Sequence, residues 1–284
     1  MKAYGIGFSD IGKQRSTNED AMLVDNNLGL YVVSDGMGGH AAGEIAAREA
    51  VASVASYVRA QARLLERIQA GQVSQSLLSS IAGIAVARAC RHVYLYACEH
   101  PEMAGMGCTL TVLLIGRDKA AMAHVGDSRL YLERHGKLRQ MSVDHTVAEE
   151  FARRGLITRD EIPLIPQGHA LARAVGVRES VEVDEMLFSI RPGDRFIMCS
   201  DGVWGYLDDL RDMEEFLFLL DPDEMAESLV AFANTAGGHD NATALVVDVR
   251  ATTAVEANSI MASLESSITL ELIEPVRVSS EIRA

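Results

Sequence analysis

The hydrophobic positions of this chain follow two patterns, short apolar runs and longer stretches with helical spacing. Short runs bounded by turn residues predict strands over 3–8, 21–25, 28–34, 109–115, 120–125, 129–133, 181–188, 195–199 and 242–249. Apolar residues at helical spacing predict long helices over 42–68 and 74–98 and shorter ones over 207–220 and 222–235. This order predicts helices packed outside a β core.

Two segments depart from these patterns. Residues 142–176 hold one short predicted helix, 146–154, followed by Pro163, Pro166 and Gly168 with little periodicity, which indicates a surface excursion. From Ala251 onward Ala, Ser, Thr and Glu dominate, which is typical of a loosely attached appendage. We therefore expect one domain over 1–250 and an appendage over 251–284.

Composition narrows the classes of protein that this chain fits. Its 284 residues are 48% hydrophobic and 23% charged, which is ordinary globular usage. The net charge of −14 argues against binding to nucleic acid or to an anionic membrane. The four cysteines lack Cys-x-x-Cys spacing and read as buried reduced thiols, and no apolar stretch is long enough to span a membrane. We expect a cytoplasmic monomer.

Acidic residues beside the apolar runs are the main candidates for a functional site. Asp35-Gly36 follows the run 30–33, Asp201-Gly202 follows 196–199, and Asp240-Asn241 precedes the last strand. A carboxylate at a buried strand end is costly unless its charge is compensated, and converging carboxylates form an oxygen site for hard divalent cations. A single Asp-Gly pair is more simply a turn, but the repetition behind apolar strands favours metal ligation.

Further candidates lie near the N-terminus. Glu19 and Asp20 add two carboxylates just before a predicted strand, although both also fit a solvated loop end. Arg15 has the planar guanidinium that grips two phosphate oxygens at once, or it is a surface residue paired with Glu19 or Asp20. His40 opens the long helix, where a structural role outweighs that of a proton donor.

Asp127 lies between two predicted strands, in Gly126-Asp127-Ser128. On sequence alone a hairpin turn is an adequate interpretation of this segment.

The ordered motifs resemble those of one family. They are Arg15-x-x-Asn18-Glu19-Asp20, Asp35-Gly36-Met37-Gly38-Gly39, Gly105-Met106-Gly107-Cys108-Thr109, Gly126-Asp127-Ser128-Arg129, Ser142-Val143-Asp144-His145-Thr146, Leu171-Ala172-Arg173-Ala174-Val175-Gly176, Asp201-Gly202 and Asp240-Asn241. In this order they are similar to the metal-dependent serine/threonine protein phosphatases of the 2C type (PPM family), in their bacterial branch. The resemblance covers residues 3–249.

The resemblance implies an α+β fold, a four-layer α-β-β-α sandwich with two central antiparallel sheets flanked by helices. It implies two Mn²⁺ or Mg²⁺ ions, bridged by Asp35, with the Gly36 carbonyl on one ion and Asp201 and Asp240 on the other. Glu19 and Asp20 would act on metal-bound waters, Asp127 matches a third-ion position, Arg15 matches a phosphate clamp, and 142–176 would be a flap beside the site.

The implied function is hydrolysis of phosphoserine and phosphothreonine on proteins by a metal-activated water, opposing a bacterial Ser/Thr kinase, with Arg15, Asp35 and Asp201 as the catalytic residues. The alternative is a catalytically weak phosphoprotein-binding regulator on the same fold. Two positions depart from the family. Met37 stands where animal members carry a His proposed as general acid, and Cys108 replaces a Thr of many bacterial relatives.

Overall fold

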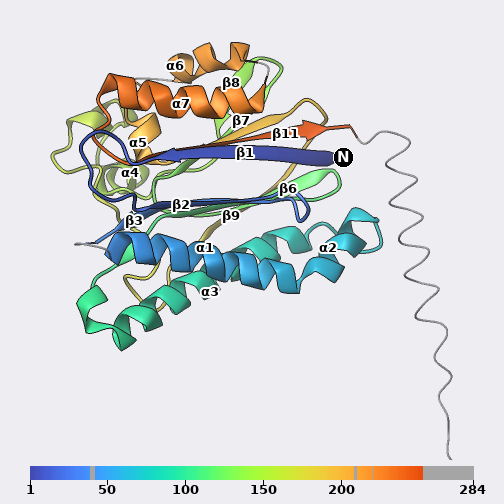
Figure 1. Cartoon of the computed structure of the whole chain (residues 1–284), viewed down its shortest axis with the longest axis horizontal. Coiled ribbons are helices and arrows are strands. Elements are labelled where there is room, and N and C mark those ends of the chain that lie inside the picture. The colour runs from blue at the N-terminus through green and yellow to red at the C-terminus, as the bar shows by residue number, and fades with distance from the viewer. Residues whose placement is uncertain (39–41, 208–209, 220, 252–284) are drawn as a thin grey trace, which may run out of the picture. The chain divides into compact units, whose positions relative to one another are not determined.

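The computed structural model describes residues 1–38, 42–207, 210–219 and 221–251, and within Met1–Arg250 it has four layers (Figure 1). Two antiparallel sheets face each other, and helices cover the outer face of each sheet. The predicted α+β sandwich is confirmed by this architecture and by the solved structures that it matches.

The sheets combine strands that are distant along the chain. Sheet 1 has the order β1 (Lys2–Asp10), β11 (Ala242–Arg250), β10 (Arg195–Cys199), β7 (Arg129–Arg134) and β8 (Lys137–Gln140). Sheet 2 has the order β2 (Asp20–Asp25), β3 (Leu30–Met37), β5 (Leu110–Ile115), β6 (Lys119–Val125) and β9 (Asp184–Ser189), and β4 (Gly107–Cys108) also pairs with β3. The final described strand therefore lies beside the first.

The helices form the outer layers. Against sheet 2 lie α1 (Ala42–Ala60), α2 (Ala62–Gln69) and α3 (Leu77–Glu99), and against sheet 1 lie α5 (Asp201–Trp204), α6 (Leu210–Glu214) and α7 (Pro222–Ala236). The remaining elements are α4 (Val147–Arg153) and the 3₁₀ turns η1 (Pro101–Met103), η2 (Arg159–Leu164) and η3 (Glu215–Phe218). None of the helices within the described ranges combines the length and the apolar character that crossing a membrane requires.

Apolar side chains fill each space between layers. Tyr31, Phe196 and Leu245 are fully buried between the two sheets, while alternate residues of the same strands face the helices. This alternation is what period-2 patterning in a two-sided sheet requires. Each such large side chain contributes about 1.5–3 kcal/mol by burial, so the sandwich can support a costly polar site at one end.

Several predicted boundaries were wrong. The helix predicted over 42–68 is two helices, because Gln61 N–H donates to the Val58 carbonyl (2.9 Å) and tightens the turn at the end of α1. The strand predicted over 28–34 runs on to Met37, because β4 pairs with Gly36 and Met37. Asp35 and Gly36 therefore lie inside a strand and not after its end.

Other differences are smaller. The strand predicted over 181–188 begins at Asp184, and β4 and β8 were not predicted. The helix predicted over 207–220 is α6 followed by η3, with 208, 209 and 220 outside the described residues. The predicted appendage lies outside the described residues from 252 onward.

Candidate metal centre

Carboxylates from both sheets meet at one end of the sandwich. Asp20 begins β2 and stands directly opposite Asp35 of β3 in the antiparallel register. Asp201 begins α5, one residue after the end of β10, and its charge contributes to raising the pKa of Asp35. The three carboxyl groups therefore lie close enough for their charges to interact.

The carboxyl groups of Asp20, Asp35 and Asp201 all have pKa values above the ordinary value of an aspartate. Burial, and then the charges of Asp20 and Asp201, raise the pKa of Asp35 well above its ordinary value. Burial raises the pKa of Asp20 to about 7, against the hydrogen bonds from Thr243 and Ser200 that lower it. The pKa of Asp201 is also raised, mainly by burial. Such groups favour a proton or a cation as a neighbour.

The donor atoms fit a hard divalent cation. Asp20 Oδ2 accepts hydrogen bonds from Ser200 Oγ (2.7 Å) and Thr243 Oγ1 (2.6 Å), which fix the carboxylate in place. Asp20 Oδ1 and Asp201 Oδ1 are buried and have no hydrogen-bond partner among the described residues. Buried carboxylate oxygens without partners are ligands that Mg²⁺ and Mn²⁺ take.

Throughout the described part of the chain, no three His, Cys, Asp or Glu side chains already surround a common coordination point.

Gly36 is required by packing. A Cβ at this position would lie 2.1 Å from the Gly43 carbonyl oxygen of α1 and 2.6 Å from the Glu19 carbonyl oxygen. Gly36 N–H also donates to that Glu19 oxygen (3.1 Å). The first turn of α1 can approach the site only because residue 36 has no side chain.

The other acidic candidates lie at the rim. The Glu19 carboxylate packs against Gly43, and burial raises its pKa. Asp240 lies just before β11 and pairs with Arg15, with 2.6 Å between Arg15 Nη2 and Asp240 Oδ2. The alternative that paired Arg15 with Glu19 or Asp20 named the wrong partner. Because 46% of the Arg15 side chain is exposed, the guanidinium stays accessible to a ligand.

Asp127 lies in a connection between the sheets. Its neighbours β6 and β7 belong to different sheets, so the interpretation of 126–128 as a hairpin turn was wrong. The side chain is 6% exposed, and burial and the charge of Asp201 raise its pKa to about 8. The charge of Asp127 in turn raises the pKa of Asp35, so this carboxyl group lies near the cluster.

Asn241, predicted only as part of a motif with Asp240, makes several hydrogen bonds beside the candidate site. Its Oδ1 accepts from Glu19 N–H (2.7 Å), and its Nδ2 donates to the carbonyls of Ile11 and Thr17 (2.9 Å each). One amide thus ties the loop that carries Arg15 to the start of β11. The only sequence signal was its place beside Asp240. The Asp20 partners Ser200 and Thr243 were missed, although both are polar residues among apolar ones.

The remaining candidates have simpler positions. His40 lies outside the described residues, and Met37 ends β3. Cys108 is buried, with its thiol 3.7 Å from the Ala46 carbonyl, which is a packing role. The cysteines are free thiols, and Cys98 is exposed rather than buried as predicted.

Comparison with known proteins places this geometry in a family. The sequence profile of the family described as protein phosphatase 2C matches residues 9–234. The serine/threonine phosphatase stp of Listeria monocytogenes is 33% identical over 244 residues, 84% of this chain and 93% of the relative. The phosphatase PstP of Mycobacterium tuberculosis is 35% identical over 245 residues, 85% of this chain but 44% of that longer protein.

Solved structures agree. The crystal structure of the M. tuberculosis phosphatase PstP/Ppp matches with a TM-score of 0.78 at 31% identity, over 88% of this chain and 100% of the other. The PstP catalytic domain in complex with two manganese ions matches with a TM-score of 0.75 at 31% identity, over 88% and 99% of the two chains.

Without metal, the carboxylate cluster should make stability fall as pH rises. A carboxyl whose pKa is raised in the folded state stabilises it fully below the unfolded pKa, near 4, and this stabilisation is lost as pH rises through the folded value of about 7 for Asp20 and about 8 for Asp127. Each additional proton held by the folded state changes the unfolding free energy by about 1.4 kcal/mol per pH unit. Urea unfolding in EDTA from pH 5 to pH 8.5 measures the loss.

Asp201→Asn is the matched variant for that measurement. It removes one carboxylate and keeps the shape of the side chain, so its loss over the same range should be smaller by at least about 1 kcal/mol. Subtracting the two profiles cancels the opposite effect of the buried His124 and His145, whose pKa values are lowered by burial. Parallel profiles would show that Asp201 is not coupled to the cluster.

Proposed function

The chain belongs to the protein phosphatase 2C family and is a serine/threonine protein phosphatase, and we propose that the carboxylate cluster is its two-metal catalytic site. The observation that carries the proposal is the close grouping of Asp20, Asp35 and Asp201, in which the charges of Asp20 and Asp201 raise the pKa of Asp35 and two buried oxygens have no hydrogen-bond partner among the described residues. The alternative of a catalytically weak regulator would be marked by loss of a carboxylate ligand, and every predicted carboxylate is present.

Asp35 and Asp201 are the proposed ligands of the core ions, together with the Gly36 carbonyl and Asp240, while Glu19 and Asp20 would hold water molecules. Mn²⁺ or Mg²⁺ at such a site supplies positive charge to the phosphoryl oxygens and lowers the pKa of water. The metal-bound PstP domain supports metal dependence. Ser200 and Thr243 hold Asp20 in one orientation, so its oxygen can accept a proton from water at a fixed place.

Arg15 is the proposed phosphate clamp. Its guanidinium lies at the rim beside Asp240, where a phosphate monoester entering from solvent would meet it before reaching the buried carboxylates. Asp127 is the proposed accessory site, serving protonation of the leaving oxygen, which the Met37 thioether cannot perform.

The wider setting is also proposed. Residues 1–250 would form the catalytic domain, with 142–176 as a flap beside the site, and the substrates would be phosphoproteins modified by a cognate Ser/Thr kinase. The free cysteines support a reducing compartment, the cytoplasm, and we expect a monomer.

Asp201→Asn tests the proposed function directly. The variant should fold but lose more than about 99% of Mn²⁺-dependent phosphopeptide turnover, because it keeps the shape and removes an anionic ligand. Steady-state release of phosphate, with Mn²⁺ and with EDTA, measures this. Turnover by the unmodified protein that survives chelation would refute a metal-dependent reaction, and a variant that retains a tenth of kcat would show that Asp201 is not a ligand.

Arg15→Ala and Arg15→Lys separate clamping from charge. A bidentate charged contact is worth roughly 1.5–3 kcal/mol, so Arg15→Ala should raise KM for phosphopeptide about tenfold or more while kcat changes less. Lysine keeps the positive charge beside Asp240 but lacks the planar fork, so a clamp predicts a raised KM in both variants. Full recovery by lysine would reduce Arg15 to an electrostatic partner of Asp240.

Asp127→Ala should distinguish the accessory site from the core. We expect two tightly bound Mn²⁺ ions to remain and most phosphopeptide turnover to be lost. An aryl phosphate has a better leaving group that needs less protonation, so its hydrolysis should fall less. Parallel kinetics on both substrates test this, and equal losses would remove leaving-group protonation from the role of Asp127.

A further inference from the structure

The segment Gly126-Asp127-Ser128 connects β6 to β7 and contains a glycine, and contacts from other parts of the chain fix its conformation. Gly126 has φ +110°, which suits glycine, and a Cβ there would lie 2.6 Å from the Thr109 side chain. His145 hydrogen-bonds both backbone groups of this glycine. Its backbone N–H donates to the Gly126 carbonyl (2.7 Å), and its ring Nδ1 accepts from Gly126 N–H (3.1 Å). Because glycine alone would let the chain rotate, the direction of the Asp127 side chain depends on these outside contacts.

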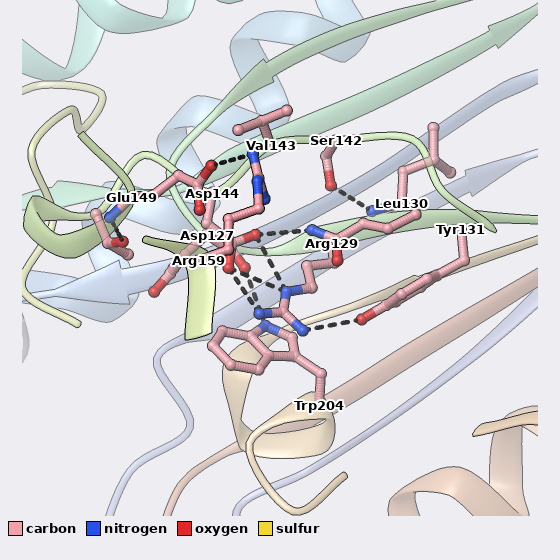
Figure 2. Close-up of polar contacts among 12 residues, drawn as sticks. Asp127, Arg129, Leu130, Tyr131, Ser142, Val143, Asp144, Glu149, Arg159 and Trp204 are labelled. Carbon is pink, nitrogen blue, oxygen red and sulfur yellow. Dashed lines mark hydrogen bonds and ion pairs between the residues drawn. The ribbon is translucent and has the colours of Figure 1, made fainter. Parts of the chain in front are cut away.

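The carbonyl of Asp127 itself is held by one side chain. Trp204 Nε1–H donates to it at 2.9 Å, from the last residue of α5. Figure 2 shows the indole beside Asp127, with the Arg129 guanidinium lying against the ring, 3.5 Å from its centroid. A cation stacked on an indole stabilises the pair by about 0.5–2 kcal/mol, so Trp204 is fixed on one face.

Arg129, which stacks on the Trp204 indole, is itself held by two other side chains. Arg129 Nε donates to both carboxylate oxygens of Asp144 (3.1 Å each), Nη2 donates to Asp144 Oδ2 (2.7 Å), and Nη1 donates to Tyr131 Oη (3.3 Å). The Arg129 and Asp144 side chains are only 22% and 13% exposed, so solvent weakens this pair less than a surface pair. Asp144 directly precedes His145, so two adjacent residues hold both sides of the connection.

The position of Trp204 links two carboxylates of the site. Asp201 and Trp204 are the first and last residues of α5, three positions apart and so on one face of a single turn. The first residue of this turn, Asp201, is a proposed ligand of the core ions. The last residue, Trp204, hydrogen-bonds the main chain of Asp127, the proposed accessory carboxylate.

We propose that Trp204 is a positioning residue whose indole N–H, braced by Arg129 and Asp144, holds Asp127 so that its carboxyl group faces Asp35 and Asp201. The inference rests on the proposed role of Asp127. Trp204 would act through Asp127, without touching the substrate or the core ions itself. A purely structural role would instead lower stability without changing what Asp127 does.

Trp204→Phe is the sharpest variant, because the ring can still stack under Arg129 while the N–H donor is lost. Turnover of phosphopeptide should fall about fivefold to tenfold, the worth of one buried hydrogen bond, with KM unchanged. In the Asp127→Ala background the same substitution should have no further effect. Free Mn²⁺, counted by electron paramagnetic resonance, should show both tight ions retained and the weaker, Asp127-dependent ion bound about fivefold to tenfold less well.

Tyr31→Phe is the matched control. It also removes one donor from a buried aromatic residue, since Tyr31 Oη donates to Asn26 Oδ1 (2.9 Å) between the sheets. It should lower thermal stability and leave ion binding and kinetics unchanged. Equal losses from Trp204→Phe in the unmodified protein and in the Asp127→Ala background would overturn the inference, as would unchanged turnover.

Different results would refute the accessory ion at Asp127 and the positioning role of Trp204. If the unmodified protein and Asp127→Ala bind the same number of ions, the accessory ion is absent and that part of the proposed function fails. The kinetic comparison in the two backgrounds would still decide whether Trp204 acts through Asp127.

Discussion

Mutual repulsion among partly buried carboxylates is the constraint on which the rest of this structure depends. Asp20, Asp35 and Asp201 are brought together at one end of the sandwich, where burial and one another's charge oppose ionisation. An isolated Asp at any one of these positions would simply take up a proton. The surrounding fold stabilises the cluster with neutral donors, the hydroxyls of Ser200 and Thr243, and with glycine where side chains would collide.

The sequence predicted the parts of this arrangement that are local. Apolar runs beside Asp35 and Asp201 indicate buried strands whatever their partners are, and the family resemblance supplied the sandwich that joins them. Pairing between distant strands leaves no such trace. The apolar pattern of β6 and β7 is the same whether the two strands pair or lie in different sheets, which is why Asp127 was interpreted as a hairpin residue.

Side chains that act through hydrogen bonds were also beyond the sequence. By residue type Asn241 is typical of a turn and Trp204 of a core. Yet each side chain hydrogen-bonds a main-chain group that is far away in the sequence. Their importance comes from geometry that only the packed layers create. Arg15 shows the same limit, since its acidic partner proved to be Asp240 and not a neighbour in sequence.

The pairing of β1 with β11 has a consequence for synthesis. Asp20 accepts a hydrogen bond from Thr243, 223 residues later, and Glu19 N–H donates one to Asn241, 222 residues later. A chain still emerging from the ribosome therefore carries its N-terminal acids for most of its elongation, at about 5–20 residues per second, without the strand that completes their surroundings. The acidic end of the sandwich is completed only when the C-terminal edge of the domain arrives, so these contacts form only after nearly all of residues 1–250 are made.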